Sequence, residues 1–221
     1  MPRPVLQTAK AMSHDPFGAR VASEQELREL VGTPGEIAIA KQIPALDQHC
    51  RTLISYSPYV LLSTSDASGR CDVSPKGDAP GFVRVIDDSH LVIPDRPGNK
   101  RVDGMRNILA NPHVGLLFLI PRRHETLRVN GRACILRDEQ LLHSMAVDGK
   151  SPRVGIGVSV QEVFIHCGKA SFRSHLWDPV HWRDVSELAS PGCMLLEHAK
   201  PVGMTVEAMD RRFDDDRNRL Y

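Results

Sequence analysis

Motifs of several common enzyme classes are missing from this chain of 221 residues. It contains no GxSxG nucleophile elbow, no HExxH zinc motif and no P-loop, so hydrolase chemistry has no motif to support it. Aromatic residues are few, with two Trp, three Tyr and six Phe. Such a chain has no stacking ladder for single-stranded nucleic acid. We therefore expect a small-molecule partner and no nucleic acid.

A surplus of charge of one sign is also lacking. The chain has 28 Lys and Arg residues against 27 Asp and Glu residues, so any anion site must be local. The five cysteines are scattered and never spaced as CxxC, which argues against a disulfide framework and against a metal site. The sequence has no signal-peptide core and no apolar run near the roughly 18 to 20 residues of a membrane span. We expect a cytoplasmic protein without a membrane partner.

Hydrophobic periodicity predicts one domain, residues 23–221, after an N-terminal arm over residues 1–22. The first helix begins at an N-cap, Ser23, with Glu26 as its capping-box partner. Further helices are predicted at about 35–42, 45–55, 101–112, 138–147 and 204–219. Strands are predicted over 59–65, 71–74, 82–87, 90–93, 113–120, 125–136 and about 154–166. The spacing of the strands suits a meandering barrel.

Two cationic, glycine-containing segments lie between these strands, SPKG at 74–77 and DRPGNKR at 95–101. The second lies where a strand passes into a helix, so free backbone N–H groups are expected near Arg96, Lys100 and Arg101. Gly98 allows a close backbone approach, and Asn99 is suited to donate through its amide or to cap the helix. The pattern fits a bound phosphate about as well as it fits a solvated, charged turn.

The strand pattern around Lys76 and Arg128 also has two interpretations. Lys76 follows Pro75 at a strand end, where it either points a charge at a ligand over the sheet or is an ordinary surface lysine. Thr126, Arg128 and Asn130 share one face of their strand. They either contact a bound ring or phosphate or form the polar outer face of a barrel.

Two further groups lie near the end of the last long strand. His166 and Cys167 have no neighbours at metal-ligand spacing and no motif for an activated thiolate, so a buried cysteine is the simpler interpretation. Arg173 and Trp177 are one helical turn apart, a spacing that suits stacking on a planar phosphorylated ligand. A role in the core or in a subunit contact fits them equally well.

Six segments follow one another along the chain, namely SPKGD, PGFVRV, LVIPDRPGNKR, NILANPHVGLLFLIP, TLRVNGRA and HCGKA. In this order, and over about residues 25–180, they resemble the pyridoxamine 5'-phosphate oxidase-like family of FMN-binding split β-barrels. The resemblance implies a mainly β fold with flanking helices, built on a six-stranded antiparallel split barrel. It also implies a homodimer with FMN in grooves between the subunits. The predicted FMN-binding residues are Ser74, Pro75, Lys76, Gly77, Arg96, Asn99, Lys100, Arg101, Thr126, Arg128, Arg173 and Trp177.

The resemblance is incomplete at one place that bears on the substrate. The oxidases that act on vitamin B6 end in a tryptophan followed by Arg-x-His, whereas this chain ends in DDDRNRLY. We therefore expect an FMN-dependent oxidoreductase that acts on another small organic molecule. Because a flavin performs the electron chemistry, no catalytic side chain is predicted. The alternatives are a flavin carrier or redox sensor without turnover, and a split barrel that binds deazaflavin or haem.

Overall fold

The computed structural model of the protein describes residues 16–221, so residues 1–15 of the predicted arm lie outside the described residues. The chain divides into two units, residues 1–40 and residues 41–221. In the described part of the first unit, helix α1, Glu24–Val31, is followed by the short helix α2, Glu36–Ala40.

The start of α1 confirms the predicted N-cap. Ser23 Oγ accepts a hydrogen bond from the Glu26 N–H at 3.1 Å, which satisfies one free donor of the first turn. The Glu26 carboxylate accepts from the Ala22 N–H at 2.8 Å, not from Ser23, so the reciprocal half of the capping box is displaced by one residue. Gly32, at φ 79°, ends the helix in a conformation that favours glycine.

The second unit contains the sheet. Its strands are β1 (Tyr59–Ser65), β2 (Cys71–Gly77), β3 (Arg84–Val85), β4 (His90–Pro94), β5 (His113–Leu119), β6 (Thr126–Leu136) and β7 (Gly155–His166). Its helices are α3 (Gln48–Tyr56), α4 (Asp103–Ala110), α5 (Glu139–His143), α6 (Lys169–Arg173), η1 (Pro179–His181), α7 (Pro191–Ala199) and α8 (Val206–Arg217).

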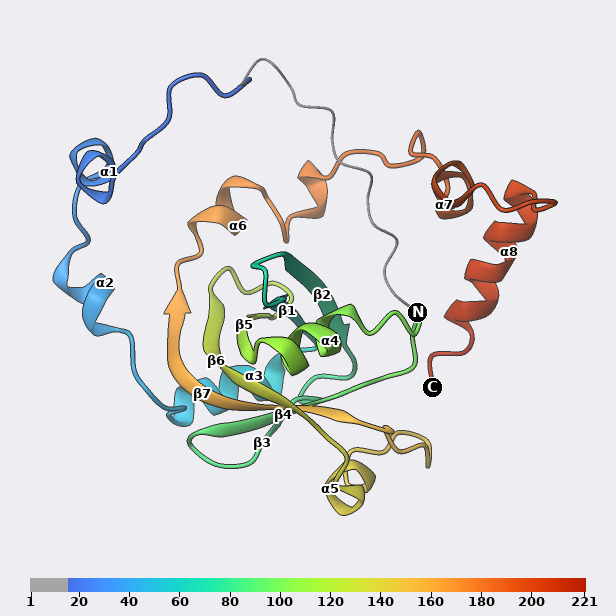
Figure 1. Cartoon of the computed structure of the whole chain (residues 1–221), viewed down its shortest axis with the longest axis horizontal. Coiled ribbons are helices and arrows are strands. Elements are labelled where there is room, and N and C mark those ends of the chain that lie inside the picture. Colours follow the sequence, from blue (N-terminus) through green and yellow to red (C-terminus); the bar gives the residue numbers. More distant parts are fainter. Residues whose placement is uncertain (1–15) are drawn as a thin grey trace. The chain divides into compact units, whose positions relative to one another are not determined.

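All seven strands form one antiparallel sheet in the order β2-β1-β5-β6-β7-β4-β3. β2 and β3 each pair with one strand only, so the sheet curls without closing (Figure 1). This confirms the predicted mainly β, split-barrel fold with flanking helices. The strand pattern predicted seven strands, as observed, whereas the resemblance implied a barrel of six. The shortest of the seven, β3, has two residues and pairs with β4 alone.

Strand β3 is shorter than the strand predicted over residues 82–87. Gly81, at φ 83°, donates its N–H to the Ser57 carbonyl oxygen at 3.3 Å, and the Phe82 N–H bonds the Ala79 carbonyl oxygen at 3.1 Å. These turn hydrogen bonds occupy backbone groups that a longer ladder with β4 would need. The ladder therefore begins only at Arg84.

The predicted hairpin of β1 and β2 is confirmed, and its turn is organised by one carboxylate. Asp66 Oδ1 accepts hydrogen bonds from the N–H groups of Ser68, at 2.8 Å, and Arg70, at 3.0 Å. The Ser68 hydroxyl donates to the same oxygen, and these bonds lower the pKa of the Asp66 carboxyl. Gly69 supplies the positive φ, 84°, that the turn requires.

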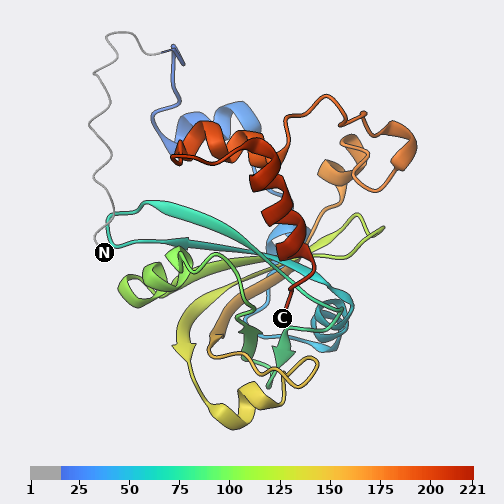
Figure 2. The same ribbon diagram turned by 90° about the vertical axis from the view of Figure 1, so that its right-hand side faces the viewer.

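Alternation of buried and outward-facing residues along β1 and β5 separates the core from the outer face of the sheet. On β1, Val60 and Leu62 are buried while Leu61 and Ser63 lie on the other face, and β5 follows the same pattern. α3 and α4 contribute to the core, and Figure 2 shows them beside opposite ends of the twisted sheet. Prominent core residues are Ile54, Leu62, Ile108, Leu116, Phe118 and Val129.

Strand β7 contains a bulge that the sequence analysis did not predict. Asn130 pairs with Glu162 but Gly131 pairs with Val160, so Gln161 is an extra residue in β7. As a result the spacing of buried residues in β7 changes at the bulge: the next buried residue after Val160 is residue 163, three positions along and not two. A Cβ on Gly131 would lie 2.2 Å from the Ser159 carbonyl oxygen, so this close approach requires glycine.

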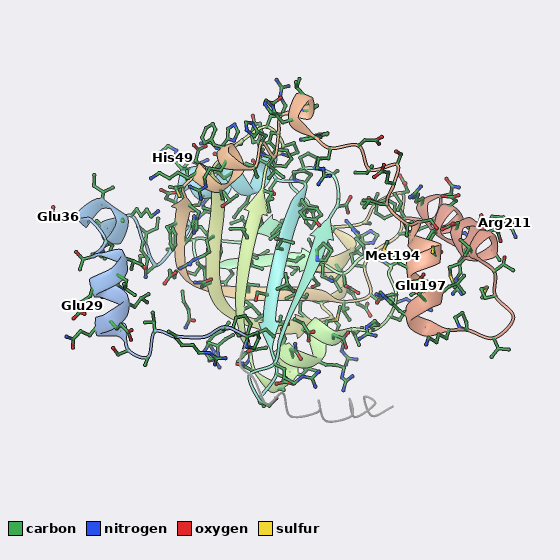
Figure 3. The ribbon with its side chains drawn as sticks, turned by 90° about the horizontal axis from the view of Figure 1, so that it is seen from above. Glu29, Glu36, His49, Met194, Glu197 and Arg211 are labelled. Atoms are coloured by element: carbon green, nitrogen blue, oxygen red, sulfur yellow. The ribbon has the colours of Figure 1, made fainter. Side chains whose placement is uncertain are left out.

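The C-terminal part adds a helix, α7, that was not predicted. Its start has a recognisable cap, because Ser190 Oγ accepts from the Cys193 N–H at 3.1 Å and Pro191 occupies the first turn. The Ser190 hydroxyl also donates to Asp210 of α8 at 2.7 Å. Figure 3 shows α7, with Met194 and Glu197, beside α8, with Arg211. Among the described residues, no helix is long and apolar enough to cross a bilayer.

Candidate functional site

A cavity of about 760 Å³ lies on the outer face of the sheet, between its strands and helix α6. Its volume falls within the range of about 300 to 1,000 Å³ typical of small-molecule sites. Most of the lining is apolar. The lining residues are Leu61, Ser63, Val73, Gly115, Leu116, Leu117, Leu119, His124, Thr126, Arg128, Asn130, His166, Cys167, Ala170, Ser171, Ser174 and Leu176.

Strand alternation explains which side chains reach this cavity. On β6, Leu127 and Val129 are buried in the core, so Thr126, Arg128 and Asn130 point to the outer face and line the cavity. The prediction that these three residues share one face is confirmed. The apolar floor comes from the outward positions of the neighbouring strands β1 and β5.

Arg128 is the cationic group of the cavity wall. Its Nη2 donates to Glu162 Oε1 at 2.7 Å, and its guanidinium lies over the Phe164 ring, 4.3 Å from the centroid. Asn130 Nδ2 donates to the same Glu162 oxygen at 2.9 Å. The Arg128 Nε is buried and has no hydrogen-bond partner in the described part of the chain. Nε itself is closed to solvent, but the side chain as a whole is 40% exposed, so a ligand acceptor would meet the accessible part of the guanidinium.

The bulge in β7 places the partners of Arg128. With Gln161 as the extra residue, Glu162 and Phe164 pair opposite Asn130 and Arg128. Without the extra residue, the regular alternation would continue from the buried Val160, and the side chain at position 162 would point into the core. Neither Glu162 nor Phe164 was predicted as a site residue, because the predicted strand over 154–166 contains no bulge.

A second polar group of the cavity, His124, was also missed. The Ser171 Oγ lies 2.8 Å from the His124 carbonyl oxygen and 2.9 Å from the Gly168 carbonyl oxygen, either of which can accept its single proton. The same Oγ lies 3.2 Å from His124 Nδ1, and this hydrogen bond holds the imidazole ring in place. The ring stacks on Phe172 at 3.6 Å. Only tertiary contacts fix His124, so no sequence spacing indicated it.

The remaining predicted residues on this side are placed differently. Arg173 is exposed on α6, and Trp177 donates its indole N–H to the Arg123 carbonyl oxygen at 2.8 Å. Neither lines the cavity within one chain. His166 and Cys167 do line it, and both are exposed, so the simple interpretation of Cys167 as a buried core residue is wrong.

Ser74 and Lys76 lie on the opposite face of the sheet from the cavity. Val73 lines the cavity, so alternation turns Ser74 and Lys76 the other way. A Cβ on Gly104 of α4 would lie 3.8 Å from Ser74 Oγ, which confirms that Ser74 faces α4. Pro75 and Gly77 are exposed and alternate with them. The structure of one chain therefore does not bring Lys76 and Arg128 together on one face.

Lys76 and the first cation of the 95–101 loop both have carboxylate partners. Lys76 Nζ lies 3.2 Å from Asp95 Oδ1, and Arg96 Nε donates to Asp78 Oδ2 at 2.5 Å. The Tyr221 hydroxyl donates to the other Asp78 oxygen at 2.5 Å, and its ring lies beneath the Arg96 guanidinium. Arg96 is thus part of a network that joins the loop to Tyr221.

This network predicts a pH-dependent contribution to stability. Burial alone would raise the pKa of Asp78, but hydrogen bonds from Tyr221, the Ala79 N–H and Arg96 together lower it. Because the pKa is lower in the folded state, the ionised carboxylate stabilises the fold at pH values above the ordinary pKa of the carboxyl. This contribution is lost as the pH falls through the folded-state pKa. Tyr221→Phe should therefore lower the melting temperature most at neutral pH, with the gap to the wild type closing in acid. A gap that stays constant down to pH 3 would contradict this assignment.

The exposed end of the loop is held by short-range contacts. Asn99 Oδ1 accepts from the Arg101 N–H at 3.0 Å, and Arg101 Nε lies 2.8 Å from Asp103 Oδ2. The N-cap position of α4 is Val102, so Asn99 stabilises the turn and does not cap the helix, which was one of the two roles suggested for it. Lys100, at φ 60°, is exposed beside it.

One buried amide, not predicted, ties α4 to the β1–β2 hairpin. Asn107 is 2% exposed, and its Nδ2 donates to Thr64 Oγ1 at 3.0 Å and to Asp72 Oδ2 at 2.7 Å. Because buried polar groups are costly unless paired, these bonds fix α4 against the hairpin. They hold the 95–101 loop, which precedes α4, close to β2.

Residues 46–167 match the model of the family described as pyridoxamine 5'-phosphate oxidase. No curated protein matches the chain. The match includes all seven strands of the sheet, the 95–101 loop and Arg128. It ends just before α6, so Arg173 and Trp177 lie outside it.

Several solved structures are similar to part of the chain. HupZ of Group A Streptococcus is 22% identical with a TM-score of 0.44, over 54% of this chain and 93% of that one. A putative pyridoxamine 5'-phosphate oxidase of Lactobacillus delbrueckii is 23% identical with a TM-score of 0.42, over 55% and 99%. HutZ, a haem storage protein of Vibrio cholerae, is 14% identical with a TM-score of 0.39, over 54% and 94%.

Proposed function

The chain belongs to the pyridoxamine 5'-phosphate oxidase family, and we propose that it binds FMN in the cavity beside Arg128 and oxidises or reduces a small organic molecule there. One observation carries the proposal. A largely apolar cavity of about 760 Å³ has in its wall a partly exposed guanidinium, that of Arg128, which Glu162 and Phe164 hold in place. An apolar cavity with few, well-placed polar groups is the usual form of a cofactor site.

The residues of the cavity fit a flavin ring in their chemistry. Leu61, Leu117 and Leu119 offer apolar contact area, and Arg128 offers a donor for a ring carbonyl oxygen or nitrogen. Glu162 and Phe164 hold the guanidinium in place, so it loses little conformational freedom on binding. FMN, when bound, supplies the transfer of electrons to or from the substrate.

We propose that the FMN phosphate is held by the predicted group at the β2 edge, namely Lys76, Asn99, Lys100 and Arg101. Within residues 16–221, β2 is an edge strand that pairs with β1 alone, so a ligand that crosses this edge reaches both faces of the sheet. Lys76→Ala and Arg101→Ala should each weaken FMN binding by about 1.5 to 3 kcal/mol, the value of a charged hydrogen bond. Isothermal titration of the apo-protein with FMN measures this.

Arg106→Ala is the matched control for these variants, because Arg106 is an exposed cation on α4. Its FMN affinity should equal that of the wild type. If Lys76→Ala and Arg101→Ala also leave the affinity unchanged while Arg128→Ala weakens it, the phosphate lies on the cavity side of the sheet.

We further propose that the protein is a homodimer, with the second subunit over the mouth of the cavity. Val73 and Leu176 line the cavity yet are 63% and 42% exposed, and apolar groups of this kind beside a site mark contact surfaces. Arg173 and Trp177 are then available to the flavin of the other subunit. Light scattering should give twice the chain mass, and Val73→Asp should shift the protein toward the monomer.

The competing functions differ in measurable ways. A flavin carrier or sensor would bind FMN but fail to turn over, which stopped-flow reoxidation of the reduced flavin with candidate acceptors would reveal. A deazaflavin or haem protein would release a different compound on denaturation, which mass spectrometry would identify. The apolar walls favour a small, weakly polar substrate.

A further inference from the structure

A turn after α6 brings three side chains with metal-ligating atoms together. His175, Asp178 and His181 each offer one such atom, and these atoms lie within 4.8 Å of one another. His181 Nδ1 is 2.8 Å from Asp178 Oδ2, and His175 Nδ1 is 3.9 Å from the same oxygen. Among the described residues, this is the one group of three or more His, Cys, Asp or Glu side chains so arranged.

The backbone of the turn is closed on itself, so the three residues are held as a set. The Asp178 N–H bonds the His175 carbonyl oxygen at 2.9 Å, and the His181 N–H bonds the Asp178 carbonyl oxygen at 3.1 Å. The Trp182 indole donates to the His175 carbonyl oxygen at 3.2 Å. A preformed backbone of this kind lowers the cost of bringing ligands to an ion.

We propose that His175, Asp178 and His181 form a binding site for a divalent first-row transition metal ion such as Zn²⁺ or Co²⁺. Two imidazoles and one carboxylate form a ligand set that favours these ions over Mg²⁺ or Ca²⁺. Water would fill the remaining coordination positions. The carboxylate offsets part of the ionic charge. Ligand distances of about 2.0 to 2.2 Å place tetrahedral ligand atoms roughly 3.4 Å apart, a spacing close to the present one, in which the three atoms lie within 4.8 Å of one another.

One rearrangement is required. The His175 and His181 rings are stacked, with centroids 3.9 Å apart and planes at 14°. The nitrogen lone pairs lie in the ring planes, and nearly parallel planes do not converge on one ion. At least one ring must therefore turn about its Cβ–Cγ bond, and both side chains are half-exposed and free to do so. The ion then replaces the hydrogen bond between His181 and Asp178.

The site would act on the cavity through its position in the chain. Leu176, which lines the cavity, directly follows His175. The Trp177 indole N–H donates a hydrogen bond to the Arg123 carbonyl oxygen. An ion that joins residues 175 and 181 would hold this segment in place. We therefore assign the ion a structural role at the cavity wall. The assignment of the metal site does not depend on the identity of the cofactor.

The test uses the untagged, full-length protein after dialysis against a chelator. Titration with Co²⁺, followed by its visible absorption, and with Zn²⁺, followed by calorimetry, should show one ion per chain. Asp178→Asn and His181→Ala should each weaken binding at least tenfold. His198→Ala, which removes an exposed histidine of α7, should bind like the wild type.

Two further readouts keep the result interpretable. Far-ultraviolet circular dichroism checks that the variants remain folded, and Zn²⁺ should raise the melting temperature of the wild type but not of Asp178→Asn. Equal binding by the wild type, Asp178→Asn and His181→Ala would overturn the proposal, as would no binding at micromolar metal. Either result would leave an ordinary turn in which Asp178 only hydrogen-bonds His181 and the Val180 N–H.

Discussion

Arg128→Ala is expected to reduce the affinity for FMN by about 10-fold to 150-fold, the equivalent of 1.5 to 3 kcal/mol for a charged hydrogen bond. The substitution removes the partly exposed guanidinium from the cavity wall. It also leaves Glu162 without its cation, at 2.7 Å in the wild type. Fluorescence titration of the apo-protein with FMN measures the loss.

Two variants make the result specific to the geometry of Arg128. Arg128→Lys keeps the charge but cannot reproduce the forked donors of a guanidinium, so we expect it to bind FMN nearly as weakly as Arg128→Ala. Arg132→Ala removes an exposed arginine of the same strand, whose Nη1 lies 3.2 Å from His113 Nε2. It should bind like the wild type. Wild-type affinity in Arg128→Ala would place the cofactor outside this cavity.

Gly131→Ala should both destabilise the protein and weaken FMN binding. The added methyl would lie 2.2 Å from the Ser159 carbonyl oxygen, so the backbone must shift, at a cost of about 1 to 3 kcal/mol. The shift acts at the bulge that turns Glu162 and Phe164 toward Arg128. We expect a lower melting temperature and an affinity for FMN reduced beyond any loss of folded protein.

Gly98→Ala is the control for the stability effect, since a Cβ there has nothing within 4 Å. Its melting temperature without ligand should equal that of the wild type. A Gly131→Ala protein that melts like the wild type would show that β6 and β7 separate easily at this point, and that the bulge does not fix the register.

The strands were predictable because burial is decided residue by residue along them. On β6 apolar and polar residues alternate, and β1 and β5 contain short apolar runs; burial alternates along all three observed strands. The caps of α1 and the β1–β2 turn depend on contacts within a few residues, so their signals are local. α7 has such a cap at Ser190 as well, and its start was predictable in principle.

The cavity wall was only partly predictable, because it depends on long-range contacts. Thr126 and Arg128 were found from strand period, but Glu162 and Phe164 reach Arg128 only through the bulge at Gln161. His124 is positioned by Ser171, 47 residues further along the chain. Periodicity alone contains no information about such pairs.

The relation between the two predicted groups of cofactor residues also required the structure. The sequence places SPKG and TLRVNGR on strands but does not say which faces they share. The observed register pairs Val60 with Lys76 and Ser63 with Val73, which turns Lys76 toward the α4 side and Val73 toward the cavity. One substitution on each face therefore tests whether a single ligand contacts both.

The most direct test of the account is titration of the purified, untagged protein with FMN, followed by absorption spectroscopy and calorimetry. We predict one FMN per chain, a shifted flavin spectrum that indicates a water-poor site, and binding that Arg128→Ala weakens. A protein that is purified without flavin, takes up none on titration and shows no spectral change would contradict the proposal that this cavity is a flavin site.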